Sequence, residues 1–300
     1  MNQLEAASII EKQAIKSLAY KFDNKLIHPI RLIQASKSLI GLDLDNPNQK
    51  LLKFNSDYLD NNEYQKFDNR NFIVNDLNEV INIHDLERAF LDNDKDKVFE
   101  VLNHVSKVSS SLHILEYLIE ISLKQSGNSF LIIWSIYRII FFIDKKEVEL
   151  FIDLSIDSIF EDKFENLDST YSQDFKDIIN FSNLSVLDID LFSHLLELNA
   201  SVLVRGDKIH SLIAAMIFRK FDSNKNTTFN FESQKLEYVQ LLKIGRPWLL
   251  DFLNKIDKNK ITIELILFLD SIRCLFKFLD KKYYKSICVH FERLVKVFNV

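Results

Sequence analysis

The stretch from Phe130 to Ile143 constrains the fold more than any other part of the sequence. Only Ser135 and Arg138 interrupt its apolar sequence, FLIIWSIYRIIFFI, so no polar face exists at either a helical or a strand period. A helix that is apolar on every side must be buried on every side. Crossing a bilayer needs roughly 20 apolar residues, and this run is shorter and is followed by charged residues. We therefore predict that residues 128–143 form the central helix of a soluble protein.

The scarcity of glycine and proline extends this prediction to the whole protein. The 300 residues include only 4 glycines and 3 prolines, whereas sandwiches, barrels and doubly wound sheets depend on these residues in their tight turns. We predict an all-α fold of about a dozen helices, stacked as antiparallel hairpins in an irregular solenoid or a large bundle. No repeat of fixed period is evident in the sequence.

Local signals indicate where several helices begin and end. Pro29 follows His28 and suits a first helical position, and Gly41 lies just past the last apolar residue of that segment. Further along, three serines at 109–111 supply a turn and an N-cap. This turn separates predicted helices at 97–108 and 112–124.

We expect residues 1–300 to form a single helical domain. Three polar, unpatterned stretches are candidate soft seams within it, at 61–71, 161–173 and 222–234. Cys274 and Cys288 make neither a disulfide framework nor a metal-ligand cluster, and we predict that both are buried free thiols.

The charge and the N-terminus exclude several classes of protein. A net charge of −5 argues against a nucleic-acid binder, which would present a cationic face to phosphates. The first 19 residues show an amphipathic helical pattern rather than a signal peptide, so we expect a cytoplasmic location. The apolar segments lack flanking basic clusters, so no stable membrane insertion is expected. Nothing in the sequence determines the oligomeric state.

The motifs of the commonest enzyme classes are absent. The sequence has no glycine-rich phosphate loop, no G-x-S-x-G, no H-E-x-x-H and no C-x-x-C. Glu100 with His104, and His113 with Glu116, could in principle meet across a hairpin as metal ligands. A helical wheel puts the first pair opposite the apolar face, so we interpret these residues as solvated. No metal site is predicted, and the sequence indicates no cofactor.

Three histidines share a position in the pattern. His28, His113 and His210 each lie at or near a predicted helix start, where an imidazole can accept a hydrogen bond from a free backbone N–H. Local capping explains all three. The alternative is that some of them converge on one cavity as catalytic acid–base groups or cofactor ligands.

Arg138 is the most unusual residue of the central run. Its guanidinium keeps its charge, and burying that charge unpaired would cost several kcal/mol. We predict a structural carboxylate partner elsewhere in the sequence. The functional alternative is an anion-binding pocket formed with Trp134 and Tyr137; Arg31 is a weaker candidate of the same kind.

Two hypotheses for function follow. The first is a non-catalytic all-helical scaffold that presents a surface or groove to a protein partner, favoured by the absence of catalytic motifs and by 25 phenylalanines. The second is an all-helical enzyme, for example an oxidoreductase, with an interior cavity lined by Arg138, Tyr137, Trp134 and one or more of the three histidines. A closed cavity touching Arg138 and two histidines would favour the enzyme, and an exposed apolar groove the scaffold.

Overall fold

The structure, a computed structural model, describes residues 1–20, 27–61, 83–144, 147–164, 184–221 and 237–300. Within these ranges the regular elements are helices, and the only β contact is an isolated antiparallel bridge between Gln125 and Phe164. The predicted all-α class is therefore confirmed.

The described α-helices differ mainly in length and burial. They are α1 (Gln3–Ser17), α2 (Pro29–Ile40), α3 (Gln49–Asn61), α4 (Ile83–Leu91), α5 (Lys95–Ser106), α6 (Ser111–Ser122), α7 (Asn128–Ile139), α8 (Val148–Glu161), α9 (Val186–Asn199), α10 (Gly206–Phe221), α11 (Val239–Ile244), α12 (Trp248–Lys255), α13 (Ile263–Phe278) and α14 (Tyr284–Val295). Short 3-10 helices lie at η1 (Ile140–Phe142), η6 (Lys258–Lys260), η7 (Lys281–Tyr283) and η8 (Lys296–Phe298).

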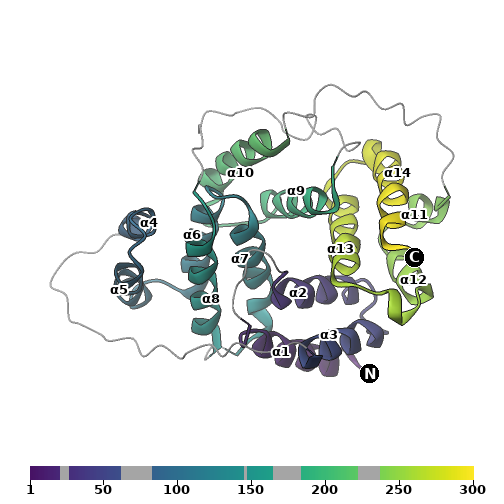
Figure 1. The fold of residues 1–300 in the computed structure, drawn as a ribbon, viewed down its shortest axis with the longest axis horizontal. Helices are drawn as coiled ribbons and strands as arrows, with labels where there is room; N and C mark the ends of the chain where they lie inside the picture. The colour runs from purple at the N-terminus through teal and green to yellow at the C-terminus, as the bar shows by residue number, and fades with distance from the viewer. Residues whose placement is uncertain (21–26, 62–82, 145–146, 165–183, 222–236) are drawn as a thin grey trace.

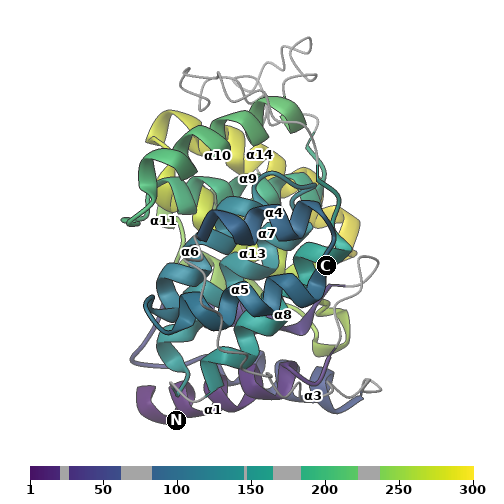
Figure 2. The same cartoon turned by 90° about the vertical axis from the view of Figure 1, so that its left-hand side faces the viewer.

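The helices pack into one continuous core. In Figure 1, α6, α7 and α8 lie side by side in the middle, with the α4–α5 pair at one end and α11 to α14 at the other. Figure 2 shows α1 and α3 along one edge of the molecule, and α10 and α14 at the opposite edge. The most extensive pairings join α13 to α9 and to α2, which are far apart in sequence. The core is thus held by long-range packing as well as by hairpins such as α4–α5.

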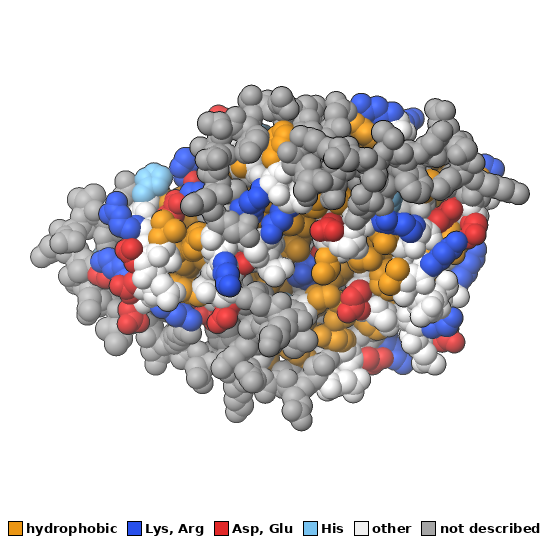
Figure 3. All heavy atoms as spheres, turned by 45° about the horizontal axis from the view of Figure 1, so that its top comes forward, with side chains coloured by type: hydrophobic (Ala, Val, Ile, Leu, Met, Phe, Trp, Pro, Cys, Tyr) orange, Lys and Arg blue, Asp and Glu red, His pale blue; other side chains and the backbone are white. Residues whose placement is uncertain are grey.

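The surface mixes charged and apolar groups. On the face that Figure 3 shows, lysine and arginine side chains are interspersed with aspartate and glutamate, and hydrophobic side chains are visible between them. Large apolar side chains that are exposed include Leu4, Phe141 and Leu187. Isolated apolar groups are ordinary on a protein surface, so only those that border a cavity call for an explanation.

The predicted central helix is present but ends earlier than expected. Residues 128–143 form α7 followed by the 3-10 turn η1, and α7 contacts α2, α6, α8 and α9. Burial on all sides holds only for the first part of the run, because the side chains of Phe141 and Phe142 are 67% and 40% exposed. A second helix is equally central: thirteen of the sixteen residues of α13 are buried. The prediction of one central helix was therefore incomplete.

The predicted helix ends around α2 and α6 are confirmed. The His28 Nδ1 atom accepts a hydrogen bond from the Ile30 N–H at 3.2 Å, Pro29 is the first residue of α2, and Gly41 is its C-cap. At α6 the N-cap is Ser110, whose Oγ accepts from the His113 N–H at 3.3 Å. These ends are set by local chemistry, so short-range signals were sufficient to find them.

Other predictions have mixed outcomes. Cys274 and Cys288 are buried free thiols, as predicted.

The candidate seams at 61–71, 161–173 and 222–234 lie almost entirely outside the described residues. Among the described helices, none combines the length and apolar character that crossing a membrane would require.

A pair of glycine substitutions tests the packing of α7. Gly127 is the N-cap of α7 with φ of +111°, and an added Cβ would lie 3.1 Å from Leu191 Cδ2. We expect Gly127→Ala to lower the free energy of unfolding by about 1–3 kcal/mol, from backbone strain and steric conflict. Urea denaturation at unchanged m value measures this. Gly41→Ala is the matched control, since its φ is −63° and the new Cβ makes ordinary contacts; equal midpoints for the two variants would contradict the strain.

Candidate functional site

A network of buried charges lies between α2, α7, α9 and α13. It consists of Arg31, Arg138, Asp190, His194, Glu197, Asp270 and Arg273. Helical spacing brings them together, because α9 carries its three members at intervals of four and three residues, and the two on α13 are three residues apart. We call this set the core ion-pair network.

Arg138 has the carboxylate partner that its sequence context predicted. Its Nη1 atom lies 2.7 Å from Glu197 Oε2 and 3.8 Å from Asp270 Oδ2. The Nη2 atom donates a hydrogen bond to Ser38 Oγ at 2.7 Å. The guanidinium therefore joins α7 to α2, α9 and α13 at once.

His194 is held between two carboxylates. Its Nδ1 atom lies 2.8 Å from the Asp190 carbonyl oxygen and 3.3 Å from Asp190 Oδ1, and its Nε2 atom lies 3.5 Å from Asp270 Oδ2. Burial alone disfavours the imidazolium, but these two carboxylates outweigh burial and raise the pKa of His194 to about 9. His194 is therefore a cation at neutral pH.

The two aspartates are also paired with arginines. Arg31 forms an ion pair with Asp190, which also accepts a hydrogen bond from Ser271 Oγ at 3.0 Å. Arg273 Nε donates to Asp270 Oδ1 at 2.5 Å. Although burial raises the pKa of both carboxyl groups, the neighbouring cations outweigh it and hold both pKa values below the ordinary range.

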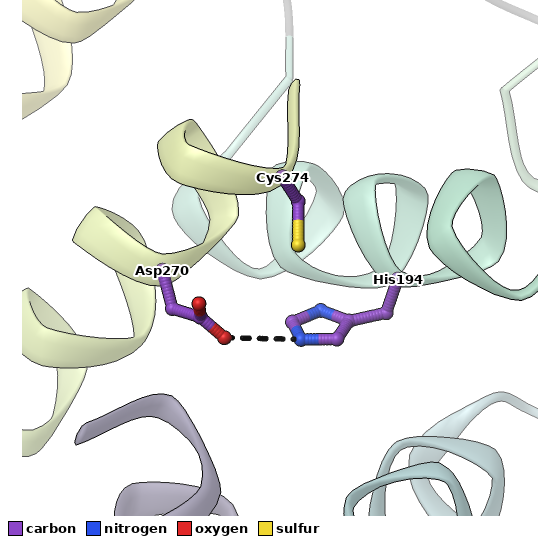
Figure 4. A group of neighbouring side chains, drawn as sticks. All are labelled: His194, Asp270 and Cys274. Carbon is purple, nitrogen blue, oxygen red and sulfur yellow. Dashed lines mark ion pairs between the residues drawn. The ribbon is translucent and has the colours of Figure 1, made fainter. Parts of the chain in front are cut away.

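His194, Asp270 and Cys274 are close enough together to be considered as metal ligands. Figure 4 shows their side groups converging from α9 and α13, and one ligand atom of each lies within 4.8 Å of the others. A metal ion would need a neutral imidazole and a thiolate. Without an ion, two carboxylates raise the pKa of His194, burial raises the pKa of the Cys274 thiol well above its usual value, and Arg273 pairs with Asp270. A metal ion would therefore have to displace two protons and compete with an ion pair.

The core ion-pair network has more positive than negative charge. Its negative charges are the three carboxylates of α9 and α13. Against them stand three guanidinium groups and the His194 imidazolium. Beside Arg138 this network opens to solvent.

That opening is a pocket of about 600 Å³ beside Arg138. At its buried side lie the charged groups of Arg138, Glu197 and Arg273. At its exposed edge lie Leu44 and Phe141, whose side chains are 49% and 67% exposed. We refer to it as the Arg138 pocket.

Aromatic rings form one wall of the Arg138 pocket. Trp134 and Tyr137 stack with ring centroids 5.5 Å apart and planes at 13°, and the Phe141 ring meets Tyr137 edge-on at 6.2 Å. The Trp134 Nε1–H donates to Glu197 Oε2 at 3.3 Å, which fixes the indole. The three residues predicted for ligand binding, Arg138, Tyr137 and Trp134, therefore line one pocket. Their role in binding stays a prediction.

Lys37 is a pocket residue that the sequence did not reveal. Its Nζ atom donates to the Arg138 carbonyl oxygen at 2.6 Å and lies 4.4 Å from the centroid of the Phe142 ring. Burial and then the Arg138 charge lower the pKa of Lys37 to about 7, although Glu197 opposes this shift. The only sequence signal for Lys37 as a pocket residue would have been its position within the buried face of the amphipathic helix at 29–40.

The three histidines predicted as catalytic candidates lie apart from this pocket. His28 is buried as the N-cap of α2, and burial together with the Arg31 charge lowers its pKa to about 4. His113 and His210 are exposed on α6 and α10. None of them lines the Arg138 pocket, so the geometry gives no support to a shared catalytic cavity.

The interpretation of Glu116 as a solvated residue was wrong, and Glu120, on the same helix α6, is buried as well. Glu116 and Glu120 are 4% and 1% exposed. The segment between α9 and α10 covers them: the Val204 N–H donates to Glu116 Oε2 at 3.0 Å, and Arg205 Nη2 lies 2.5 Å from Glu120 Oε2. Glu116 is thus a structural acceptor, not a metal ligand with His113.

Sequence reasoning also missed most of the core ion-pair network. Asp270 and Arg273, three residues apart in an otherwise apolar helix, were a usable signal for a buried pair. Glu197 carried no signal, since a glutamate near a helix end is usually solvated. Its partners come from α7 and α13, which only the tertiary structure brings to it.

Comparison of this sequence and structure with known protein families, with curated proteins and with solved structures finds no match in any of the three.

Removing the Arg138 charge should destabilise the fold. In Arg138→Met the Glu197 carboxylate loses its closest partner while it stays buried, so we expect the free energy of unfolding to fall by about 3–5 kcal/mol. Lys124→Ala is the control: its pair with Glu87 is more exposed, and its loss should cost less than about 1 kcal/mol. Equal melting temperatures for both variants and the unmodified protein would refute a paired, buried role for Arg138.

The His194 imidazolium should make stability depend on pH. Because its pKa is higher in the folded than in the unfolded state, its contribution is complete below pH 6.5 and is lost as the pH rises through about 9. The stability difference between the unmodified protein and His194→Gln should shrink by up to about 3 kcal/mol between pH 6 and 9.5. Urea midpoints measure it, with His113→Gln, at an exposed site, as control. A difference independent of pH would contradict the charged state.

Proposed function

We propose that this protein is a non-catalytic scaffold and that a partner protein docks at the Arg138 pocket. The observation that supports this most is the exposed apolar edge of the pocket. Phe141 is 67% exposed, and Leu44 and Phe142, which are 49% and 40% exposed, line the same pocket, so an apolar rim borders a charged interior. Exposed aromatic groups of this kind serve as anchors in protein interfaces.

The size of the occupant follows from where the apolar groups lie. A small molecule enclosed by the buried side of the pocket would leave Phe141 and Leu44 in water. A peptide segment of a partner that enters the pocket would also cover this rim and remove its apolar surface from solvent. The rim therefore favours a protein partner over a free metabolite.

The enzyme hypothesis has weaker support from the same geometry. Among the described residues that line the pocket, the carboxylate is that of Glu197. Arg138 and Arg273 both pair with it and lower its pKa, so it is a poor proton acceptor. Lys37 titrates near neutral pH but has no carboxylate partner among the described residues through which to relay a proton. No histidine lies in the described lining.

A displayed library of random peptides tests the proposal. Immobilised protein should enrich peptides with apolar residues, and Phe141→Ser should weaken binding of the enriched peptides about tenfold or more, as expected for loss of an aromatic anchor. Dissociation constants by titration calorimetry provide the measurement.

Leu187→Ser is the matched control, because Leu187 is similarly exposed and lies outside the pocket lining. It should leave the affinities unchanged. The proposal fails if no peptide is enriched, or if Phe141→Ser and Leu187→Ser bind the enriched peptides equally well.

A further inference from the structure

The Arg138 pocket has an excess of cations at its surface. Lys37, Arg138, Arg273 and Lys277 all line it, and the carboxylate of the described lining is Glu197 alone. Glu197 is already engaged, since Oε2 faces Arg138 at 2.7 Å and Oε1 faces Arg273 at 3.5 Å. Asp270, behind the lining, pairs with Arg273 at 2.5 Å and lies 3.8 Å from Arg138, so the two arginines have their counter-ions. Lys37 and Lys277 have no ion-pair partner among the described residues.

The two arginines have little capacity left for a ligand. Arg138 Nη2 donates to Ser38, and Nη1, which lies 2.7 Å from Glu197 Oε2 without forming a hydrogen bond, is buried away from the pocket volume. Arg273 uses Nε toward Asp270 and Nη2 toward Glu197 and the Cys274 sulfur. Both arginines therefore contribute positive electrostatic potential to the pocket rather than hydrogen bonds to a ligand.

Lys37 differs from both arginines. An ammonium group has three N–H donors, and among the described residues the Lys37 Nζ makes one hydrogen bond, to the Arg138 carbonyl oxygen at 2.6 Å. Its other contact is the face of the Phe142 ring. Donors are thus left for an acceptor that arrives from the pocket.

We propose that a carboxylate of the docked partner segment binds Lys37 Nζ inside the Arg138 pocket, with a neighbouring apolar side group against the Trp134–Tyr137 stack. The partner segment is therefore an acidic residue, or a C-terminal carboxylate, next to an apolar or aromatic residue. This inference rests on the proposed docking function and specifies its chemistry. Charge complementarity supports it, because the carboxylate would supply the anion that the pocket lacks.

The same geometry gives the pH dependence of binding. The charged groups around Lys37 are Arg138 on α7, Glu197 on α9, and Asp270 and Arg273 on α13. These carboxylates have lowered pKa values and the guanidinium groups stay charged, so Lys37 is the member that titrates near neutral pH. A carboxylate at Nζ favours the ammonium form. Binding above pH 7 therefore takes up a proton, and affinity should fall by about tenfold per pH unit.

The test uses two small probes that differ only in charge. 3-Phenylpropionate carries a carboxylate on an aromatic body, and 3-phenylpropionamide is its neutral counterpart. By titration calorimetry at pH 6.5, we expect the carboxylate to bind about tenfold or more tightly than the amide. Raising the pH from 7 to 8.5 should weaken the carboxylate by about tenfold or more and leave the amide unchanged.

Two variants assign the effect to Lys37. Lys37→Met keeps the apolar stem and removes the charge, and it should abolish both the preference for the carboxylate and its pH dependence. Lys107→Met removes an exposed lysine that lies outside the pocket lining and should change the affinity less than about twofold. A melting curve on each variant establishes that it is folded. If Lys37→Met is poorly folded, the charge-reversal variant Lys37→Glu replaces it, and we expect that variant to bind the carboxylate probe more weakly than the amide probe.

The outcomes separate this inference from the proposed function. Equal affinity for the two probes, or an unchanged preference in Lys37→Met, overturns the carboxylate site even if displayed peptides bind. Peptides enriched without Asp, Glu or a free C-terminus overturn it too and leave the docking function standing. Carboxylate binding with no enriched peptide overturns the partner segment as the source of the anion, and with it the docking function.

Discussion

The cost of burying charge governs the architecture of this protein. Three guanidinium groups, one imidazolium and three carboxylates lie in the core, and each would be strongly destabilising alone. They are tolerated because each one faces an opposite charge contributed by another helix. The packing of α9 against α13 and of α13 against α2 is what places these partners within reach. A change in the position of any of these helices would leave charges buried and unpaired, so the network specifies one arrangement of the core.

The network also explains why the pocket lies where it does. α7 leaves the core at its C-terminal end, where the backbone turns through η1 and exposes Phe141. Arg138 occupies the boundary: its side chain reaches inward to Glu197, while its backbone carbonyl accepts the hydrogen bond of Lys37. Structural charge pairing and the proposed binding surface thus share one residue. The two predicted roles of Arg138, a buried ion pair and a pocket residue, were not exclusive alternatives.

Charge pairing connects the core to the chemistry of the pocket. The two arginines of the pocket lining share Glu197 and Asp270, whereas Lys37 and Lys277 have no ion-pair partner among the described residues. The proton that two carboxylates hold on His194 belongs to the core ion-pair network and lies outside the pocket lining. The charges that act on Lys37 are those of Arg138, Glu197, Asp270 and Arg273.

Part of this protein follows from its sequence alone. The scarcity of glycine and proline determined the all-α class, and the chemistry of His28, Pro29 and Ser110 determined helix ends, because such features act over a few residues. The position of Arg138 in an apolar run required a partner, since its charge cannot be removed. The identity of that partner, the burial of Glu116 and the role of Lys37 were decided by the tertiary structure only. Arg31 and Asp190 are 159 residues apart, and a charge on a helix face becomes a core residue or a solvated one according to which distant segment covers it.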